Sequence, residues 1–386
     1  MSSEVEKVFR NISCDAIFAS SSLLAERGKR TGVLLFGAGN TGRQIAARCE
    51  AGGVGGVLGF VDDVRGGKGE TISNIPIFSR AEALAKFGPD ILVVVCIYKV
   101  GCFFPKLEES LTASGFNLVR SLPDFARAHP GALMPFSFFS DVQILFDHRS
   151  EIVELYNALA DEHSKIILSR WVNFRLSHQY HGMDRFDSHI YYPEFLTADL
   201  ADPFLFVDCG AYDGDSIKGL LAWRSGRPAR AIAFEPDPTN FLRMKEKVSP
   251  WVESGALTVD LHQAAVGARA GSMGFSETGD ESAHIDASGA RQVAVVTVDE
   301  VLQGGKQRAS YIKYDIEGYE VDALIGSQLA IKSHAPMLAI SLYHRPDDLW
   351  VLPRMIREWQ PRYRLYLRQH AEEGIDTVLY AIDSSR

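Results

Sequence analysis

Short apolar runs alternate with helix-length segments along two separate stretches of this chain. In the first stretch the runs are GVLLF (32–36), VLGFV (57–61) and ILVVVCIY (91–98). Runs that are apolar at almost every position are typical of parallel strands whose two faces are both buried. The segments between them are long enough for the helical crossovers that parallel strands need. The first stretch therefore predicts a parallel α/β sheet that closes near residue 127.

The second stretch has the same alternation but a different ending. It begins at FLFVDCG (204–210) and ends with YRLYLRQH (363–370) and TVLYAID (377–383). Only a short loop separates the last two strands, so they must be antiparallel neighbours. A doubly wound parallel sheet that ends in an antiparallel hairpin is the architecture of class I S-adenosylmethionine-dependent methyltransferases, and we predict that fold.

The 386 residues suggest more than one domain. We predict an N-terminal helix with a smaller Rossmann-like, nucleotide-binding-type α/β domain over residues 1–127. Residues 128–202 are helical and aromatic, and we expect a connector there that can act as a lid. Residues 203–386 form the methyltransferase-type domain.

Charge and composition exclude some classes of partner. Lys and Arg total 40 against 49 Asp and Glu, a formal net charge of −9. This balance argues against a nucleic-acid partner, which needs a basic surface. The longest apolar run is too short to span a bilayer, the start lacks a signal-peptide layout, and the five cysteines are scattered. We therefore expect a cytoplasmic protein without membrane insertion. The sequence leaves open whether the protein forms a homo-oligomer.

A glycine-rich turn follows the first strand of the second stretch. Ligands of open α/β sheets bind at the carboxyl ends of strands, where Asp208, Gly210, Tyr212 and Gly214 lie. The helix that begins near Asp215–Ser216 offers backbone N–H groups to a carboxylate. Acidic side chains here disfavour a pyrophosphate and suit a ligand that carries a sulfonium and an ammonium group.

Further acids follow the next strands. Glu235 and Pro236 end the adjacent strand, where a carboxylate can accept both ribose hydroxyls of a nucleoside. Asp315 and Glu317 follow the fourth strand, and His344 follows the fifth. The alternative is that strand-end acids only cap the next helices, as Asp215 or Asp237 can.

Several motifs of this half resemble those of the FkbM family of methyltransferases. They are FVDCGAYDGDSIKGLL, AIAFEPDPTNFLRM, HQAAVG, TVDEVL and YIKYDIEGYEVDALIGS, within residues 203–386. The resemblance implies a class I fold and methyl transfer from S-adenosylmethionine to a polyketide or carbohydrate hydroxyl. By position, Asp208, Gly210 and Gly214 would frame the methionine part, Glu235 the ribose, and Gln263–Ala264 the adenine. Tyr212 departs from the family, since many members have Asn there.

The proton of the acceptor hydroxyl needs a base at the same edge. We predict His344 in this role because its ordinary pKa suits proton removal near neutral pH. Asp315 or Lys313 would help to position the acceptor. One alternative has His344 capping the helix that opens at Pro346. Another has a metal bound by Asp315, Glu317 and His344; we assign no metal.

The first stretch carries its own glycine-rich turn, GAGNTG, with Gly37, Gly39 and Gly42, and Asp62 ends the next strand. The spacing matches a dinucleotide fingerprint. The segment also resembles front domains of bacterial sugar-nucleotide-modifying enzymes. We weigh a nucleotide or sugar-nucleotide site equally against a purely structural turn. An NAD(P) site has less support, because no Tyr-x-x-x-Lys motif lies nearby.

The sequence thus favours an S-adenosylmethionine-dependent O-methyltransferase that acts on a sugar, sugar nucleotide or polyketide hydroxyl. Its rivals are an NAD(P)-dependent oxidoreductase and a non-catalytic sugar-nucleotide-binding protein. We expect the connector around Trp171–Tyr192, with His178, Tyr180 and His181, either to cover the acceptor or to pack between domains.

Overall fold

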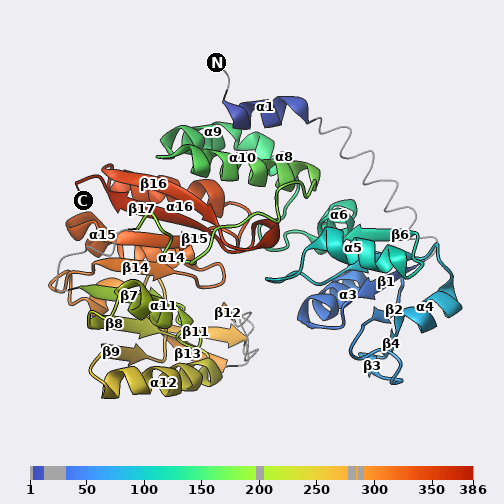
Figure 1. Cartoon of the computed structure of the whole chain (residues 1–386), viewed down its shortest axis with the longest axis horizontal. Coiled ribbons are helices and arrows are strands. Elements are labelled where there is room, and N and C mark those ends of the chain that lie inside the picture. The colour runs from blue at the N-terminus through green and yellow to red at the C-terminus, as the bar shows by residue number, and fades with distance from the viewer. Residues whose placement is uncertain (1–2, 13–31, 197–203, 277–283, 286–290, 386) are drawn as a thin grey trace. The chain divides into compact units, whose positions relative to one another are not determined.

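The computed structural model describes residues 3–12, 32–196, 204–276, 284–285 and 291–385. The chain divides into two compact units (Figure 1). The first unit comprises Met1–Val153, Ile166–Phe186 and Ala371–Ile375. The second comprises Glu154–Lys165, Asp187–His370 and Asp376–Arg386.

A six-stranded sheet in the order β3-β4-β2-β1-β5-β6 forms the centre of the first unit. All neighbours are parallel except β3 and β4, and the strand order changes direction at β1, between β2 and β5. Both faces of β1 and β5 are buried, as their continuous apolar sequences predict. The strands are β1 (Val33–Phe36), β2 (Val57–Val61), β3 (Thr71–Ile72), β4 (Ile75–Phe78), β5 (Leu92–Val95) and β6 (Leu118–Ser121).

Helices connect these strands, and their ends follow local sequence signals. Ser79 and Glu82 form a reciprocal capping box that begins α4 (Arg80–Phe87). Gly53, in the left-handed conformation, ends α3 (Asn40–Gly52). The other helical segments in this unit or crossing its boundaries are α1 (Glu4–Asn11), α5 (Phe104–Ala113), α6 (Leu122–Ala128), α7 (Pro130–Leu133), α8 (Gln143–Asp147), α9 (Arg149–Ala158), α10 (Glu162–Ser177) and η1 (Glu372–Gly374).

The second unit contains a seven-stranded sheet in the order β16-β17-β15-β14-β7-β8-β9. β17 is antiparallel to both β15 and β16, and the other neighbours are parallel. This is the predicted parallel sheet with an antiparallel terminal hairpin. Its strands are β7 (Leu205–Cys209), β8 (Ala229–Phe234), β9 (Leu257–His262), β14 (Tyr311–Tyr314), β15 (Met337–Ser341), β16 (Tyr363–Gln369) and β17 (Thr377–Asp383).

The helices of this unit lie between successive strands of the sheet, as crossover connections require. Asp237 caps α12 through bonds from the backbone N–H groups of Thr239 and Asn240. The helices are α11 (Asp215–Trp223), α12 (Pro238–Glu253), α13 (Val298–Val301), α14 (Glu320–Ile325), α15 (Gln328–His334) and α16 (Asp348–Trp359).

The sequence analysis did not predict a second, four-stranded sheet in this unit. Its order is β10-β13-β11-β12, and β11 pairs antiparallel with β13. Glycines in β11 weaken its strand signal. The valine-rich sequence RQVAVV of β13 was a strand signal that could have been used. The strands are β10 (Ala265–Val266), β11 (Gly271–Ser276), β12 (His284–Ile285) and β13 (Arg291–Val296).

The segment 128–202 is shared between the two units. Ile166–Phe186 belongs to the first unit, whereas Glu154–Lys165 and the residues from Asp187 onward belong to the second. Two of the boundaries between units in this segment thus fall inside α9 and α10, and the third follows Phe186. The connector with its lid role stays a prediction. None of the helices in the described part of the chain has both the length and the apolar character needed to cross a membrane.

Candidate active site

The predicted site residues follow neighbouring strands of the seven-stranded sheet. Asp208 lies near the end of β7, and Glu235 directly follows β8. Asp315 directly follows β14, and His344 comes three positions after β15. These four strands are parallel neighbours, so their carboxyl ends meet at one edge of the sheet. The strand order therefore collects side chains that are far apart in the sequence.

The turn after β7 fits only glycine at its closest approach to β14. Gly210 has a φ of 89°, and a Cβ there would lie 1.9 Å from the backbone oxygen of Asp315. The N–H groups of Gly210 and Ala211 both donate to the carbonyl of Phe234. Tyr212 and Gly214 also have positive φ values, of 48° and 85°. The turn thus packs its backbone against the ends of both flanking strands.

Glu235 accepts hydrogen bonds from backbone on both sides. The N–H of Tyr212 donates to Oε2 at 2.9 Å, and the N–H of Asp237 donates to Oε1 at 2.9 Å. Burial raises the pKa of Glu235 to about 7 despite these two bonds. Each carboxylate oxygen has two lone pairs, so bonds from the backbone leave acceptor capacity for ligand hydroxyls.

Asp208 and Lys313 form a buried ion pair on adjacent strands. Their side chains are 0% and 2% exposed, and Nζ of Lys313 lies 3.1 Å from Oδ1 of Asp208. Lys313 also donates to the carbonyl of Gly210 at 2.6 Å, and the Ser216 hydroxyl donates to Oδ2 of Asp208. The buried carboxylate of Asp208 thus contacts the groups that hold the glycine-rich turn, and its role in framing a ligand stays a prediction.

Two tyrosines hold the carboxylate of Asp315. Tyr191 donates to Oδ2 at 2.6 Å, and Tyr343 donates to Oδ1 at 3.1 Å. Burial raises the pKa of Asp315, but Lys313, His344 and the hydrogen bonds lower it, and the net direction is downward. The side chain keeps 21% exposure. Asp315 is therefore an ionised carboxylate that can reach a ligand.

The sequence analysis named neither tyrosine as a site residue. Tyr343 directly precedes His344, and Tyr191 lies in the aromatic segment that was assigned to the connector. Its position next to His344 was the only sequence feature that could have indicated Tyr343 as a site residue. Tyr191 is 124 positions from Asp315, so no local pattern pairs them.

His344 is surrounded by carboxylates. Its Nδ1 lies 2.8 Å from Oε1 of Glu320, and its Nε2 lies 3.5 Å from Asp315 and 3.7 Å from Glu317. Burial lowers the pKa of His344, but Glu320, Glu317 and Asp315 raise it, and the net direction is well above the ordinary value. An imidazole that already carries its proton donates hydrogen bonds. This charge state works against the predicted role of His344 as a base near neutral pH.

The remaining predicted cofactor residues surround the same turn. Asp215 is the first residue of α11, and its Oδ1 accepts from the N–H of Ser216 at 2.7 Å. Pro236 is half-buried beside Glu235. Gln263 and Ala264 follow β9, the neighbour of β8, with Gln263 exposed and Ala264 buried. Within the described residues, no group of three or more His, Cys, Asp or Glu side chains is arranged to hold a metal ion.

The glycine-rich turn of the first unit is also tightly packed. Gly37 has a φ of 106°, and a Cβ at Gly42 would lie 2.0 Å from the carbonyl oxygen of Gly37. A Cβ at Gly39 would meet no atom within 4 Å. Asp62 accepts from the N–H of Ala38 at 3.0 Å and from two N–H groups of the following turn. Its carboxylate therefore ties the two turns together. A nucleotide at this turn stays a prediction.

Of the segment expected to cover the acceptor or to pack between domains, Tyr180, His178 and His181 lie in the first unit. The Tyr180 ring lies 5.0 Å from the rings of Phe104 and Phe174. Nδ1 of His178 lies 2.7 Å from Asp124, and the His181 side chain is exposed. These contacts show that Tyr180 and His178 pack within the first unit.

Residues 208–367 match the family model described as the methyltransferase FkbM domain. The methyltransferase FkbM from Methylobacillus flagellatus KT has a similar structure, with a TM-score of 0.71 and 24% identity over 95% of this chain and 98% of that chain. This likeness establishes a common fold.

Two other solved structures are far less similar. A putative rRNA-methylase from Clostridium thermocellum has a TM-score of 0.29 and 9% identity over 47% of this chain and 86% of that chain. The pyocyanin biosynthetic protein PhzM has a TM-score of 0.24 and 9% identity over 72% of this chain and 67% of that chain. No curated protein matches the chain.

Proposed function

Because the chain carries an FkbM methyltransferase domain at residues 208–367, we propose that it transfers a methyl group from S-adenosylmethionine to a hydroxyl oxygen. The proposed acceptor is a sugar, sugar nucleotide or polyketide, and the proposed compartment is the cytoplasm. The observation that carries the proposal is the row of groups at one sheet edge: the glycine-rich turn after β7, Glu235 after β8 and Asp315 after β14.

The residues at this edge fit the donor. Gly214 is the N-cap of α11 and has no side chain to cap it. Apart from that of Ser216, which donates to Asp215, the N–H groups of the first turn can therefore donate to the carboxylate of the methionine part. Glu235 offers acceptor oxygens for ribose hydroxyls, and Gln263 and Ala264 lie one strand further along, at the predicted adenine position. When bound, S-adenosylmethionine supplies a methyl group on a positively charged sulfur. Nearby carboxylates stabilise such a charge.

The edge also contains a group for the acceptor. Asp315 is ionised and partly exposed, so its carboxylate can accept a hydrogen bond from the attacking hydroxyl and take its proton. We propose that His344, held protonated by Glu320, Glu317 and Asp315, keeps Asp315 in place. Holding the acceptor oxygen in line with the methyl group can supply about 7–11 kcal/mol of the barrier reduction.

Calorimetry and a transfer assay test this function. S-adenosylmethionine should bind the full chain, and Glu235→Ala should weaken binding by about 1.5–3 kcal/mol, the range for hydrogen bonds to a charged group. Glu246→Ala, on an exposed position of α12, is the matched control and should bind normally. The acceptor is then sought among saccharide and polyketide hydroxyls with methyl-labelled donor. Absence of donor binding to folded wild-type protein would contradict the proposal.

A further inference from the structure

Tyr191 has a strained backbone that is held from both sides. Its φ is 65°, a left-handed conformation that costs a residue with a side chain roughly 1–2 kcal/mol. The N–H of Tyr191 donates to the Tyr380 hydroxyl at 2.9 Å, and the Tyr311 hydroxyl donates to the carbonyl of Tyr191. Strain of this kind persists where the surroundings enforce it, and it is concentrated at functional sites.

The strained backbone directs the side chain of Tyr191 to the site. Its hydroxyl donates to Oδ2 of Asp315 at 2.6 Å, and its ring centroid lies 4.9 Å from Nζ of Lys313. The residue is 4% exposed. Tyr191 therefore contacts the ammonium group of Lys313 on β14 and the carboxylate of Asp315 directly after that strand.

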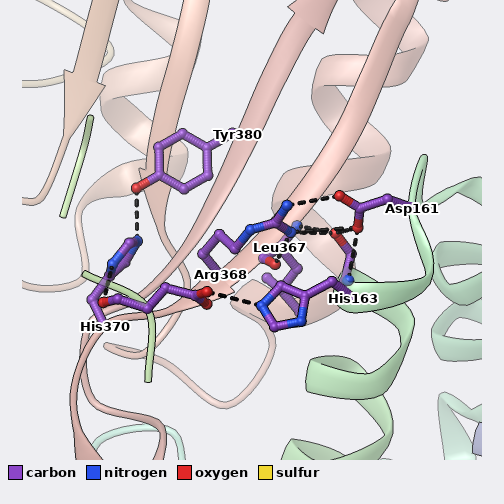
Figure 2. Close-up of polar contacts among 8 residues, drawn as sticks. Asp161, His163, Leu367, Arg368, His370 and Tyr380 are labelled. Carbon is purple, nitrogen blue, oxygen red and sulfur yellow. Dashed lines mark hydrogen bonds and ion pairs between the residues drawn. The ribbon is translucent and has the colours of Figure 1, made fainter. Parts of the chain in front are cut away.

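His370 and Tyr380 form the outer part of this arrangement (Figure 2). Nδ1 of His370 lies 3.0 Å from the carbonyl of Asp187, which only accepts, so Nδ1 carries the proton. Nε2 of the neutral ring is then the acceptor for the Tyr380 hydroxyl at 2.8 Å. The oxygen of Tyr380 remains directed at the N–H of Tyr191. Burial lowers the pKa of His370 to about 4, which keeps the ring neutral near neutral pH.

The strand that directly precedes His370 is itself anchored. Figure 2 shows Arg368 of β16 facing Asp161, with Nη2 2.7 Å from Oδ2. Nε2 of His163 lies 2.8 Å from Asp187, whose N–H donates to the carbonyl of Gln369. These bonds fix the segment on which Tyr191 lies to the end of β16.

We propose that Tyr191 is a positioning residue for methyl transfer, fixing the carboxylate of Asp315, and that His370 and Tyr380 hold Tyr191 in the conformation this requires. The inference rests on the proposed function. Tyr343 holds the other oxygen of Asp315, so the carboxylate is clamped between two phenols. Its rotation relative to the acceptor is thereby restricted before the acceptor binds.

Other charged groups also act on the two ends of this chain of hydrogen bonds. Asp315 faces Lys313 and His344, while Glu317 and Asp376 act on its partner Tyr343. None of these contacts requires the hydroxyl of Tyr191. At the other end, Asp187, Arg368 and His189 act on His370. A change confined to the Tyr191 hydroxyl should therefore report on its bond to Asp315 alone.

Tyr191→Phe keeps the ring over Lys313 and removes only the donor to Asp315. We expect kcat to fall about tenfold and the acidic limb of its pH profile to move up by about one unit, because the ionised carboxylate loses a hydrogen bond. The KM of the acceptor and the affinity for S-adenosylmethionine should stay within about twofold of wild type, because neither depends on this bond. Tyr366→Phe, whose ring stacks on Phe195, is the matched control. Wild-type kcat and pH profile in Tyr191→Phe, even with lowered thermal stability, would overturn the proposal.

Tyr380→Phe tests whether the outer residues act through Tyr191. It should lower kcat in the wild-type background and have no further effect when combined with Tyr191→Phe, since coupled residues are not additive. Effects that multiply in the double variant would refute the role given to Tyr380 and His370.

A measurement without turnover separates this inference from the proposed function. In protein labelled with ¹³C at aspartate carboxyl carbons, Asp315→Asn identifies the Asp315 resonance. We expect Asp315 to titrate at higher pH in Tyr191→Phe than in wild type. Unchanged titration would overturn the inference, whereas failure of the wild type to methylate any hydroxyl would count against the proposed function only.

Discussion

Replacing Gly210 by alanine tests how closely the turn after β7 approaches the end of β14. Gly210 has a φ of 89°, and its new Cβ would lie 1.9 Å from the carbonyl oxygen of Asp315. The obstacle is backbone of a buried strand end, so no side-chain rotation relieves it. Either the turn or the strand end must shift.

The expected cost has two parts that a second variant separates. A left-handed conformation costs an alanine about 1–2 kcal/mol, and forcing atoms into a packed region typically costs a further 1–3 kcal/mol. Gly226 lies in the same unit with a φ of 82°, and a Cβ there would meet nothing within 4 Å. We therefore expect about 1–2 kcal/mol for Gly226→Ala and about 2–5 kcal/mol for Gly210→Ala.

Urea unfolding followed by tryptophan fluorescence measures both costs. Four of the five tryptophans lie in the second unit, at positions 223, 251, 350 and 359, so the signal mainly reports its unfolding. The difference between the two variants in free energy of unfolding isolates the clash. If the two variants were equally destabilised, within about 0.5 kcal/mol, the close approach would not be the reason for glycine at position 210.

Three further outcomes are expected. The pKa of Glu235 is raised to about 7 in the folded protein, so its contribution to stability is full below the unfolded pKa and is lost as pH rises through 7. The free energy of unfolding of Glu235→Gln, measured by denaturation, should therefore rise relative to that of wild type by up to about 3 kcal/mol between pH 4.5 and pH 8. Lys313→Met leaves the buried carboxylate of Asp208 without its cation and should cost about 3–5 kcal/mol, a loss that added Asp208→Asn should reduce. The pKa of His344 is raised well above its ordinary value, so kcat should fall as pH rises through that pKa, and His344→Gln should abolish this fall. If the kcat of wild type instead rose as pH passed the pKa of His344, His344 would be the base.

Local sequence patterns were enough to predict the sheet architecture. Continuous apolar runs with crossover-length spacers indicated parallel strands, and the short loop between residues 370 and 377 required an antiparallel hairpin. The same logic placed Glu235, Asp315 and His344 at the carboxyl edge, since each directly or closely follows a strand. Period and spacing determine these features because they depend only on neighbours along the chain.

The four-stranded sheet was missed because β10 and β12 are only two residues long and β11 contains two glycines. Its pairing of β11 with β13 joins positions about twenty residues apart, so no single window of sequence contains it. Short strands of this kind are stabilised by their partners rather than by their own composition.

The sequence by itself determined that Glu235, Asp315 and His344 follow neighbouring strands, and the tertiary structure decided which groups surround them there. His344 was predicted as a base from its ordinary pKa, but three carboxylates surround it in the fold, two from the turn after β14 and one from the start of α14. Asp315 is clamped by Tyr191, which lies 124 positions away and is held in its strained backbone by Tyr380. A pKa and a side-chain position depend on every group within a few ångströms, and only packing brings such distant groups together.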